Sequence, residues 1–395
     1  MKYFIICKCL FLLTGFLLSG CQSEKSICFT NGEISFISIQ NESKKVIGDP
    51  FYFKHAEIVP LESTSSCIMG GVVQIEVADS LLFIKDTFDK LYLFKRNGKF
   101  ITQIGNKGKG PGEYLLLSSF FIDEEKRLVN ILDDYKGNIL RYDYNGNFVD
   151  NINISIENIR RCRQALLTPN RKVLINNYFN FEENMGYTFL DILKDSISSE
   201  KIFPYSPIFI KDHTYAFSKH AMEKIGKEIH FIMPLCDTVY AYSDMAFYPK
   251  YVIETPQKMV DKREFSDISV SNPYFMVMLQ TGQKGYFTGF TELFETDDML
   301  LLNYRDNGAI LGFYIGNKKT KEGNYYLYTA SFDKQMPVIP IVGSYGNQFI
   351  GTYECDNILD FKDRIDIRRP EYEKLKTIME GNHADFNPIL VFYSN

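Results

Sequence analysis

The stretch Leu91–Ile101, LYLFKRNGKFI, recurs 48 positions later as Ile139–Val149, ILRYDYNGNFV, in a chain of 395 residues. Each copy is an apolar run, a short polar break and a second apolar run, which predicts two strands joined by a turn. The breaks contain Asn97-Gly98 and Asn145-Gly146, residue types that tolerate the positive φ angles of a type I′ turn. We therefore predict two equivalent β-hairpins.

The repeat extends upstream of both hairpins. Leu81–Asp86 matches Leu128–Asp133 at an offset of 47 positions, so each unit has a further strand that ends in an aspartate. With an inner strand before it, each unit holds four strands in about 48 residues, which is the period of a propeller blade. We expect Asp86 and Asp133 to accept backbone N–H groups of the following loops. The alternative is that both point to one face and help bind a ligand or a cation.

The rest of the chain fits the same plan less regularly. We predict an all-β, six-bladed β-propeller with four-stranded antiparallel blades and a few short inserted helices, at residues 258–265, 272–279 and 369–381. A propeller must close its ring or leave sheet edges exposed. We therefore expect the apolar C-terminal run Pro388–Tyr393 to complete a blade begun near the N-terminus. The alternative is that this strand packs outside the ring.

The composition agrees with a β protein. Apolar residues make up 45% of the chain, and 26 Tyr and 33 Phe residues accompany no Trp. We expect the aromatic side chains to pack between blades. The formal net charge is −5, which argues against binding to nucleic acid.

The N-terminus indicates export. Lys2 and Lys8 precede and flank an apolar run that is too short to span a bilayer comfortably, and the run ends in Leu18-Ser19-Gly20-Cys21. This ending resembles the bacterial lipobox, in which the signal is cut before the cysteine and its sulfur carries a diacylglycerol. The alternatives are an ordinary signal peptide and an N-terminal anchor helix. Loss of residues 1–20 would change the formal charge from −5 to −7.

These observations predict three segments: a lipoprotein signal peptide at 1–20, an anchor segment with one strand at 21–50, and the propeller domain at 51–395. Gln22 follows Cys21, so no aspartate suggests retention at the inner membrane. We therefore expect the protein in the bacterial cell envelope, anchored by lipid to the outer membrane on its periplasmic or outer face.

A glycine-rich loop, GNKGKGPGEY, follows the first hairpin. It contains Gly105, Gly108, Gly110, Pro111 and Gly112. Backbone N–H groups of such a loop could bind phosphate. However, no Gly-Lys is followed by Ser or Thr here and no helix pattern comes next, as nucleotide-binding loops require. We interpret the loop as the connection between two blades, held by hydrogen bonds of Glu113 and Tyr114.

Two resemblances follow from these residues. The loop, Phe121-Ile122-Asp123, Asp133 and Arg141-Tyr142-Asp143 resemble the NHL repeat, although that repeat usually has a proline where Leu116–Ser119 stands. Residues from about 50 to 395 resemble the lipobox-bearing six-bladed β-propeller proteins of the Bacteroides group. The motifs that carry this second resemblance are Val59–Glu62, the glycine-rich loop, Asp237–Tyr240 with Tyr248–Tyr251, and Asn387–Leu390. The resemblance implies a fold and a lipid-anchored, exported location, and no catalytic motif.

No motif predicts a metal site, a cofactor or catalytic residues. The five histidines, His55, His213, His220, His230 and His383, show no H-x-H or H-E-x-x-H spacing, so we interpret them as ordinary surface or loop residues. Asp143-x-Asn145-x-Asn147 lacks the glycine and glutamate positions of a calcium loop and is read as a turn. The cysteines beyond Cys21 are widely spaced, which favours buried free thiols with at most one disulfide.

The resulting hypothesis is a lipid-anchored, exported propeller that binds a ligand or a protein at its mouth, contacts the membrane through its anchor and does not bind nucleic acid. The alternative is a propeller enzyme, a lyase or hydrolase, with a site at the central funnel built from several blades. A purely structural role in the envelope is a third possibility. Three ligand-competent side chains within about 5 Å at the mouth would favour the enzyme.

Overall fold

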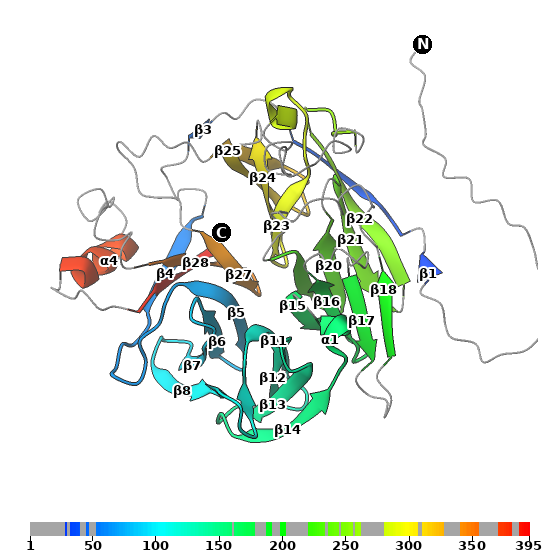
Figure 1. The fold of residues 1–395 in the computed structure, drawn as a ribbon. Helices are drawn as coiled ribbons and strands as arrows, with labels where there is room; N and C mark the ends of the chain where they lie inside the picture. The colour runs from blue at the N-terminus through cyan, green and yellow to red at the C-terminus, as the bar shows by residue number, and fades with distance from the viewer. Residues whose placement is uncertain are drawn as a thin grey trace, which may run out of the picture.

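A computed structural model shows antiparallel sheets arranged around a central axis (Figure 1). The structure describes residues 28–29, 32–39, 45–46, 53–159, 162–177, 187–191, 198–202, 220–233, 236–244, 246–255, 257–261, 280–306, 310–327, 340–354, 370–380 and 387–395. Within them, six sheets contain four strands or more. The prediction of an all-β propeller with antiparallel sheets and few helices is confirmed.

Five sheets take their four core strands from consecutive segments of the chain. The first holds β5 (Val72–Ala78), β6 (Leu81–Asp86), β7 (Leu91–Lys95) and β8 (Phe100–Ile104). The second holds β11 (Leu117–Asp123), β12 (Leu128–Asp133), β13 (Asn138–Asp143) and β14 (Phe148–Asn153). The third holds β15 (Cys162–Leu167), β16 (Val173–Asn177), β17 (Tyr187–Asp191) and β18 (Ser198–Ile202). The fourth holds β19 (Met222–Ile225), β20 (Glu228–Ile232), β21 (Thr238–Ser243) and β22 (Ala246–Glu254). The fifth holds β23 (Phe290–Glu295), β24 (Met299–Asp306), β25 (Ile310–Asn317) and β26 (Gly323–Leu327).

The sixth sheet joins the two ends of the propeller chain. It consists of β27 (Ile341–Tyr345), β28 (Gln348–Tyr353), β29 (Ile389–Ser394) and β4 (His55–Pro60). β29 and β4 pair antiparallel along their whole length, from Ile389 opposite Pro60 to Ser394 opposite His55. The prediction that a terminal strand completes a blade begun at the other end is confirmed.

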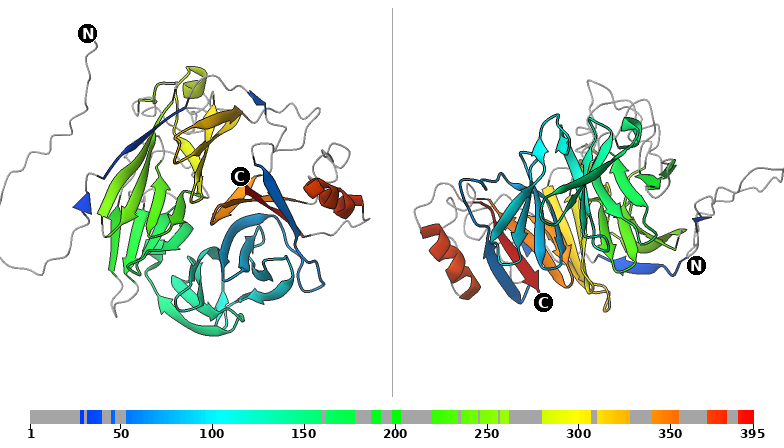
Figure 2. Two further views of the ribbon diagram at one scale, coloured as in Figure 1. Left: turned by 180° about the vertical axis from the view of Figure 1, so that it is seen from behind. Right: turned by 90° about the horizontal axis from the view of Figure 1, so that it is seen from below.

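Three short N-terminal strands lie on outer edges of the sheets. β1 (Cys28–Phe29) and β2 (Ser35–Ser38) pair parallel with β22, and β3 (Lys45–Val46) pairs parallel with β26. Seen from behind in Figure 2, the blue strands run along the edge of the green sheet. They cover backbone groups that an outer strand would otherwise leave unpaired.

The first strands of the six sheets, which we call the inner strands, follow one another around the axis. β5 lies beside β11, β11 beside β15, β15 beside β19, β19 beside β23, β23 beside β27, and β27 beside β5. Aromatic side chains fill the space between neighbouring sheets, as predicted. Phe83 of the first sheet packs in one buried cluster with Phe120 and Tyr142 of the second.

A β-bulge recurs in five of the inner strands. The register with the second strand shifts between Val72 and Gln74, and again between Leu117 and Ser119, with equivalent shifts in β15, β23 and β27. A bulge bends and twists a strand locally. The recurrence shows a structural repeat in regions where the sequence units look irregular.

The turn type predicted for the two hairpins is wrong. β7 pairs with β8 and β13 with β14, so both hairpins exist. However, Gly98 and Gly146 have φ near 85°, whereas Asn97 and Asn145 do not have positive φ. A type I′ turn needs positive φ at both central residues. The register shift beside each turn and the bond from Gly98 N–H to the Lys95 carbonyl instead match a turn that ends in a glycine bulge.

Two helices are described with both of their ends, and residues 280–283 are also helical. α1 (Ile156–Ile159) connects the second and third sheets, and α4 (Pro370–Glu380) lies outside the ring against β4, where a helix was expected at 369–381. The helix expected at 258–265 is not found over residues 258–261, where Met259 forms an isolated bridge with Phe287. The remainder of that segment and all of 272–279 lie outside the described residues.

Buried glutamines bridge neighbouring inner strands. Gln164 of β15 accepts the N–H groups of Ala221 and Met222, each at 2.9 Å, and donates to the Met222 carbonyl at 2.7 Å. Gln74 of β5 makes the equivalent bridge to β11, where it donates to the Phe120 carbonyl at 2.7 Å. Such bonds satisfy backbone groups of inner strands that do not share a ladder.

Replacing Gln164 by leucine removes this bridge. Two buried backbone N–H groups and one buried carbonyl then lose their hydrogen-bond partner. Each unsatisfied group destabilises the folded state by about 1–3 kcal/mol if the surrounding structure does not adjust. We expect Gln164→Leu to lower the free energy of unfolding by about 2–4 kcal/mol, measured by chemical denaturation. Gln103→Leu, at a half-buried outer position, is the matched control and should change stability by less than about 1 kcal/mol. Equal losses in the two variants would contradict the bridging role.

Candidate functional site

A cavity of about 320 Å³ opens at one end of the ring axis. Inner strands β5, β15, β19, β23 and β27 contribute to its wall. The hairpins that follow β11, β19 and β27 form its rim. The lining is rich in carboxyl groups: Glu76, Glu124, Glu223, Glu295 and Asp297.

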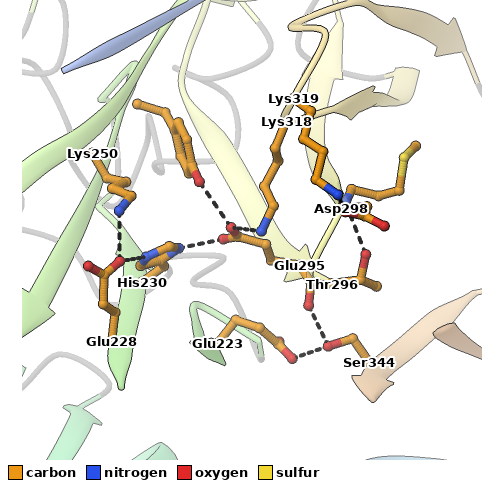
Figure 3. A network of polar contacts seen from close by, with 12 residues as sticks. Glu223, Glu228, His230, Lys250, Glu295, Thr296, Asp298, Lys318, Lys319 and Ser344 are labelled. Atoms are coloured by element: carbon orange, nitrogen blue, oxygen red, sulfur yellow. Dashed lines mark hydrogen bonds and ion pairs between the residues drawn. The ribbon is translucent and has the colours of Figure 1, made fainter. Parts of the chain in front are cut away.

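Glu223 lies in the wall with only 8% of its surface exposed. The Ser344 hydroxyl contacts Glu223 Oε1 and also lies 2.6 Å from the Glu295 carbonyl oxygen (Figure 3). One hydroxyl proton cannot serve both acceptors fully, so a protonated Glu223 satisfies this arrangement best. Burial, together with the nearby carboxylates of Glu76 and Glu295, raises the pKa of Glu223 well above its ordinary value.

His220 faces Glu223 across the wall. Its Nδ1 lies 2.7 Å from the Leu293 carbonyl oxygen, and its Nε2 lies 3.4 Å from Glu223 Oε2. Burial lowers the pKa of His220 to about 4, so the ring is neutral near pH 7. Because a carbonyl can only accept, Nδ1 carries the ring proton and Nε2 is left as an acceptor toward Glu223.

Glu76 projects from β5 into the same cavity. Burial raises its pKa to about 7, and the only opposing contributions are a weak bond from Gln74 and the charge of Lys224. The distance from Gln74 Nε2 to Glu76 Oε1 is 3.5 Å, at the limit of a hydrogen bond. Glu76 is therefore a carboxyl group with little compensation for its burial.

Glu295, by contrast, is fully compensated. It is 0% exposed, and its carboxylate receives His230 Nδ1 at 2.6 Å, Lys318 Nζ at 2.8 Å and the Tyr251 hydroxyl at 3.2 Å. Burial alone would raise the pKa of Glu295, but the charges and hydrogen bonds of His230 and Lys318 lower it. This carboxylate is ionised and joins β20 to β23.

His230 completes a buried chain of charges. Its Nε2 lies 2.7 Å from Glu228 Oε2, which Lys250 also reaches at 2.8 Å (Figure 3). Burial alone would lower the pKa of His230, but the charge of Glu295 and the bonds to both glutamates raise it. The hydrogen bond from His230 is also the main reason why the pKa of Glu228 is lowered. His230 is therefore a charged element of the structure at neutral pH.

The aspartates singled out from the sequence lie away from the cavity. Asp86 Oδ1 accepts the N–H groups of Phe88 and Lys90, each at 2.9 Å, and Oδ2 accepts that of Gly70 at 3.1 Å. Asp133 likewise accepts N–H groups on both sides of its strand end, including that of Leu115 at 2.6 Å. Both side chains are fully buried. Their loops follow second strands, so they lie at the opposite end of the ring from the cavity mouth.

The glycine-rich loop connects β8 to β11. It contains the short parallel pair β9 (Asn106–Lys107) and β10 (Glu113–Tyr114). Glu113 Oε2 accepts the Gly110 N–H at 2.7 Å, and the Tyr114 carbonyl accepts that of Gly108 at 2.8 Å. The Tyr114 hydroxyl has no hydrogen bond, and Tyr142 instead donates to the Gly112 carbonyl at 2.6 Å. The Glu113 side chain and the Tyr114 carbonyl thus occupy two N–H groups that a phosphate would need.

The interpretation of the histidines as surface or loop residues is wrong for His230, which is 1% exposed inside β20. His220 lies in the loop before β19, as a half-buried residue that lines the cavity. His213 and His383 lie outside the described residues. Sequence reasoning also missed Glu76, Glu223 and Glu295. The usable signal was a charged residue within an apolar inner strand, as in Val72–Ala78.

Within the described part of the chain, no three His, Cys, Asp or Glu side chains are placed to hold a metal ion. Cys67, Cys162 and Cys236 are free thiols there, whereas the side chain of Cys28 and all of Cys355 are outside it. None of the described helices is long and apolar enough to cross a bilayer.

The buried charge network predicts a large loss of stability when one member is neutralised. Glu295→Gln leaves His230 and Lys318 buried without their shared counter-ion, so we expect unfolding free energy to fall by about 3–5 kcal/mol. Glu57→Gln, which breaks an exposed pair with Arg96, should cost less than about 1 kcal/mol. Urea denaturation of both variants measures the difference, and a small effect of Glu295→Gln would show that the network is not a unit.

The raised pKa of Glu76 predicts a pH-dependent gain in stability on substitution. The ordinary pKa is 4.5 and the folded value is about 7. The folded state therefore binds the proton more tightly, and its stability falls as pH rises between these values. We expect Glu76→Gln to unfold at the same free energy as the parent near pH 4 and to be more stable by about 1–3 kcal/mol near pH 8.

The control for Glu76→Gln is Glu322→Gln, because Glu322 is exposed on the outer part of the fifth sheet. We expect Glu322→Gln to change the free energy of unfolding by a similarly small amount near pH 4 and near pH 8. If Glu76→Gln destabilises the protein near pH 8, then the carboxylate of Glu76 has a partner that compensates its burial.

Comparison with known proteins supports the fold and assigns no activity. A family model described as "Domain of unknown function (DUF4934)" matches residues 35–394. A crystal structure of a protein assigned as exported from Bacteroides fragilis NCTC 9343 shares 20% identity and superposes with a TM-score of 0.73, over 91% of this chain and 99% of that one. A member of the DUF4221 family from Bacteroides vulgatus shares 10% identity with a TM-score of 0.52, over 87% of this chain and 96% of that one. Among curated proteins, none matches the sequence. The likeness to NHL repeats stays a prediction.

Proposed function

The chain belongs to the DUF4934 family, a domain of unknown function, and we propose that it is a binding module of the bacterial cell envelope whose ligand or partner enters the central cavity. The observation that carries this proposal is a cavity at the axis with two carboxyl groups, half-buried Glu76 and buried Glu223, that the described residues leave poorly compensated. Cavities that collect polar groups from several elements are the usual ligand sites of folded proteins.

We take the six sheets as six blades of one ring. In this arrangement every blade but the second contributes an inner strand to the cavity wall, and the second contributes the hairpin with Glu124. Loops and strands that are distant in sequence thereby meet at one mouth. This geometry suits a ligand that is recognised from several sides.

The proposed location is the outer membrane, through a lipid on Cys21. Residues 1–20 have the pattern of a cleaved signal, and the exported assignment of the Bacteroides fragilis protein agrees with that location. The seven residues from Cys21 to Cys28 span at most about 25 Å. Cys28 pairs with Ala246, the first residue of β22. Since hairpins after first and third strands lie at the same end of an antiparallel sheet, the anchor would lie at the end of the ring that holds the cavity mouth.

The anchor is tested by Cys21→Ser. We expect the full chain to sediment with membranes when expressed in its own host class, and the variant to appear in the soluble envelope fraction, because one residue carries the lipid chains. Metabolic labelling with a radioactive fatty acid should mark the parent and not the variant. A membrane-bound, unlabelled parent would favour an anchor helix instead.

The cavity is tested by blocking it. Val77 lines the wall half-buried, and Val77→Phe should abolish co-purification of any ligand or partner retained by the parent protein. Val149→Phe, at an exposed position on β14, is the matched control and should retain it. If both variants keep the same bound species, then binding occurs elsewhere and the proposal is wrong.

An enzyme remains the second candidate because Glu223 and His220 have pKa values shifted in opposite directions and face each other at 3.4 Å. Such pairs are common in acid–base catalysis. Recovery of a chemically altered ligand from the parent protein, and of the unaltered ligand from Glu223→Gln, would favour a lyase or hydrolase over a binding module.

A further inference from the structure

Resting on the proposed binding function, we propose that the cavity recognises a cationic group, an ammonium or a guanidinium, held between the carboxylates of Glu76 and Glu223. The group could belong to a small amine or to a lysine or arginine side chain of a partner protein. Both sources present the same chemistry to the site.

The balance of charge in the lining favours a cation. Glu76, Glu124, Glu223 and Asp297 bring four carboxyl groups to the wall and rim, whereas Glu295 is neutralised by its own partners behind the wall. Lys224 is the lysine of the lining, but its side chain is 41% exposed and lies 3.6 Å from Glu124 at the rim. An anion would meet repulsion from several sides.

An orphaned buried atom points to the ligand's place. Glu223 is more than nine-tenths buried, and its Oε2 receives no hydrogen bond from the residues that the structure describes. The nearest ring nitrogen, Nε2 of His220, lies 3.4 Å away and is an acceptor, because Nδ1 holds the proton toward the Leu293 carbonyl. A donor from a ligand would satisfy Oε2, and a buried carboxylate without such a donor is unfavourable.

Two other polar groups of the wall already use their donors within the protein. The Gln164 amide is engaged by backbone groups of β19, and the Ser344 hydroxyl is engaged by Glu223 and the Glu295 carbonyl. Ammonium and guanidinium groups carry only donors, so they match this set. A volume of about 320 Å³ accommodates such a group on a short aliphatic stem.

A bare metal ion fits less well. It requires at least three converging ligands at short, defined distances. Among the described residues no such group exists. An organic cation tolerates the wider spacing of carboxyl groups that come from separate inner strands, because its donors are spread over several atoms.

Binding of a cation would be coupled to proton release. The groups that face Glu76 and Glu223 are Lys224 and His220 from the segment of β19, Glu124 from the hairpin after β11, Glu295 from β23 and Ser344 from β27. Both glutamates hold their protons more tightly than usual in the free protein. A bound cation favours their ionised forms, so affinity should rise with pH through neutrality and then level off.

Titration calorimetry of the full chain in detergent tests the proposal. The probes are n-butylguanidinium and n-butylammonium, with n-butylurea and butyrate as neutral and anionic controls of similar size. We expect saturable, millimolar or tighter binding of at least one cation near pH 8, and binding weaker by about tenfold near pH 5. Equal or tighter binding of butylurea or butyrate, or no binding of either cation, would overturn the inference.

Matched variants locate the site. Glu223→Gln and Glu76→Gln should each weaken the cation by about tenfold or more and reduce the number of protons released, which buffers of different ionisation enthalpy report. Glu322→Gln changes the net charge equally on the outer surface and should leave affinity and proton release unchanged. Unchanged binding in both site variants, with folding verified by circular dichroism, would contradict the proposed carboxylates.

Two further arms separate the possible outcomes. The first is binding of a blocked peptide with a central lysine or arginine. If this peptide binds more tightly than butylammonium, then the cationic group comes from a partner protein, and if it does not bind, then the group comes from a small amine. If a neutral or anionic species binds and Val77→Phe prevents it, then the cation inference fails while the proposed binding function stands. If Val77→Phe leaves cation binding intact, then the cation binds outside the cavity and the inference also fails.

Discussion

Pairing of β29 with β4 is the constraint on which the ring depends. These strands come from residues more than 300 positions apart, yet they pair in register over six residues. β29 is buried along nearly its whole length, whereas β4 exposes His55 and Glu57. Without this pairing the outer edge of β29 would be unpaired, and β4, which leads into the first sheet, would no longer tie that sheet to the one that contains β27. Neighbouring inner strands belong to different sheets, and glutamine side chains bridge β5 to β11 and β15 to β19, so the positions of the wall residues of the cavity depend on closure. The ring is therefore the element that brings Glu76 of β5 and Ser344 of β27 to the same mouth.

The ring centre contains two kinds of carboxyl group, one paired with cations and one not, and this difference distinguishes a structural role from a role in recognition. Glu295 has a histidine, a lysine and a tyrosine around it, and it joins β20 to β23 as an ionised group. Glu76 and Glu223 lie in the same region with no cation of comparable proximity among the residues that the structure describes, and burial shifts their pKa values upward. A chain selected for stability alone would place apolar side chains at such positions, because a buried carboxyl group without partners is destabilising. Their presence beside a cavity is the physical reason to assign them to recognition.

The sequence predicts the repeated strands and turns of the fold better than it predicts which residues meet at the central cavity. The Asn-Gly breaks, the strand-ending aspartates and the apolar C-terminal run are local patterns, and each was placed in the expected strand or turn, although the turns end in glycine bulges rather than forming type I′ turns. The bulge that recurs in the inner strands has no common sequence pattern, because the residue left unpaired is Val73 in β5 but Ser118 in β11. The cavity residues were not predicted because their relation is set by ring closure. Glu76, Glu223 and Ser344 are separated by more than 100 positions each and share no motif.

Dependence on ring closure also explains why the sequence did not predict the buried position of His230. A histidine with no histidine or cysteine nearby in the sequence does not form a local metal-binding motif. This argument does not address a partner side chain that comes from another blade. His230 meets Glu295 from a strand 65 positions away, and His220 meets the Leu293 carbonyl from 73 positions away. His230 contacts two carboxylates, those of Glu295 and Glu228, and they raise its pKa. His220 meets a backbone carbonyl instead, and burial lowers its pKa, so its ring is neutral. The protonation state of a residue such as His230 therefore depends on a carboxylate from the neighbouring sheet, which no pattern within its own segment of sequence reveals.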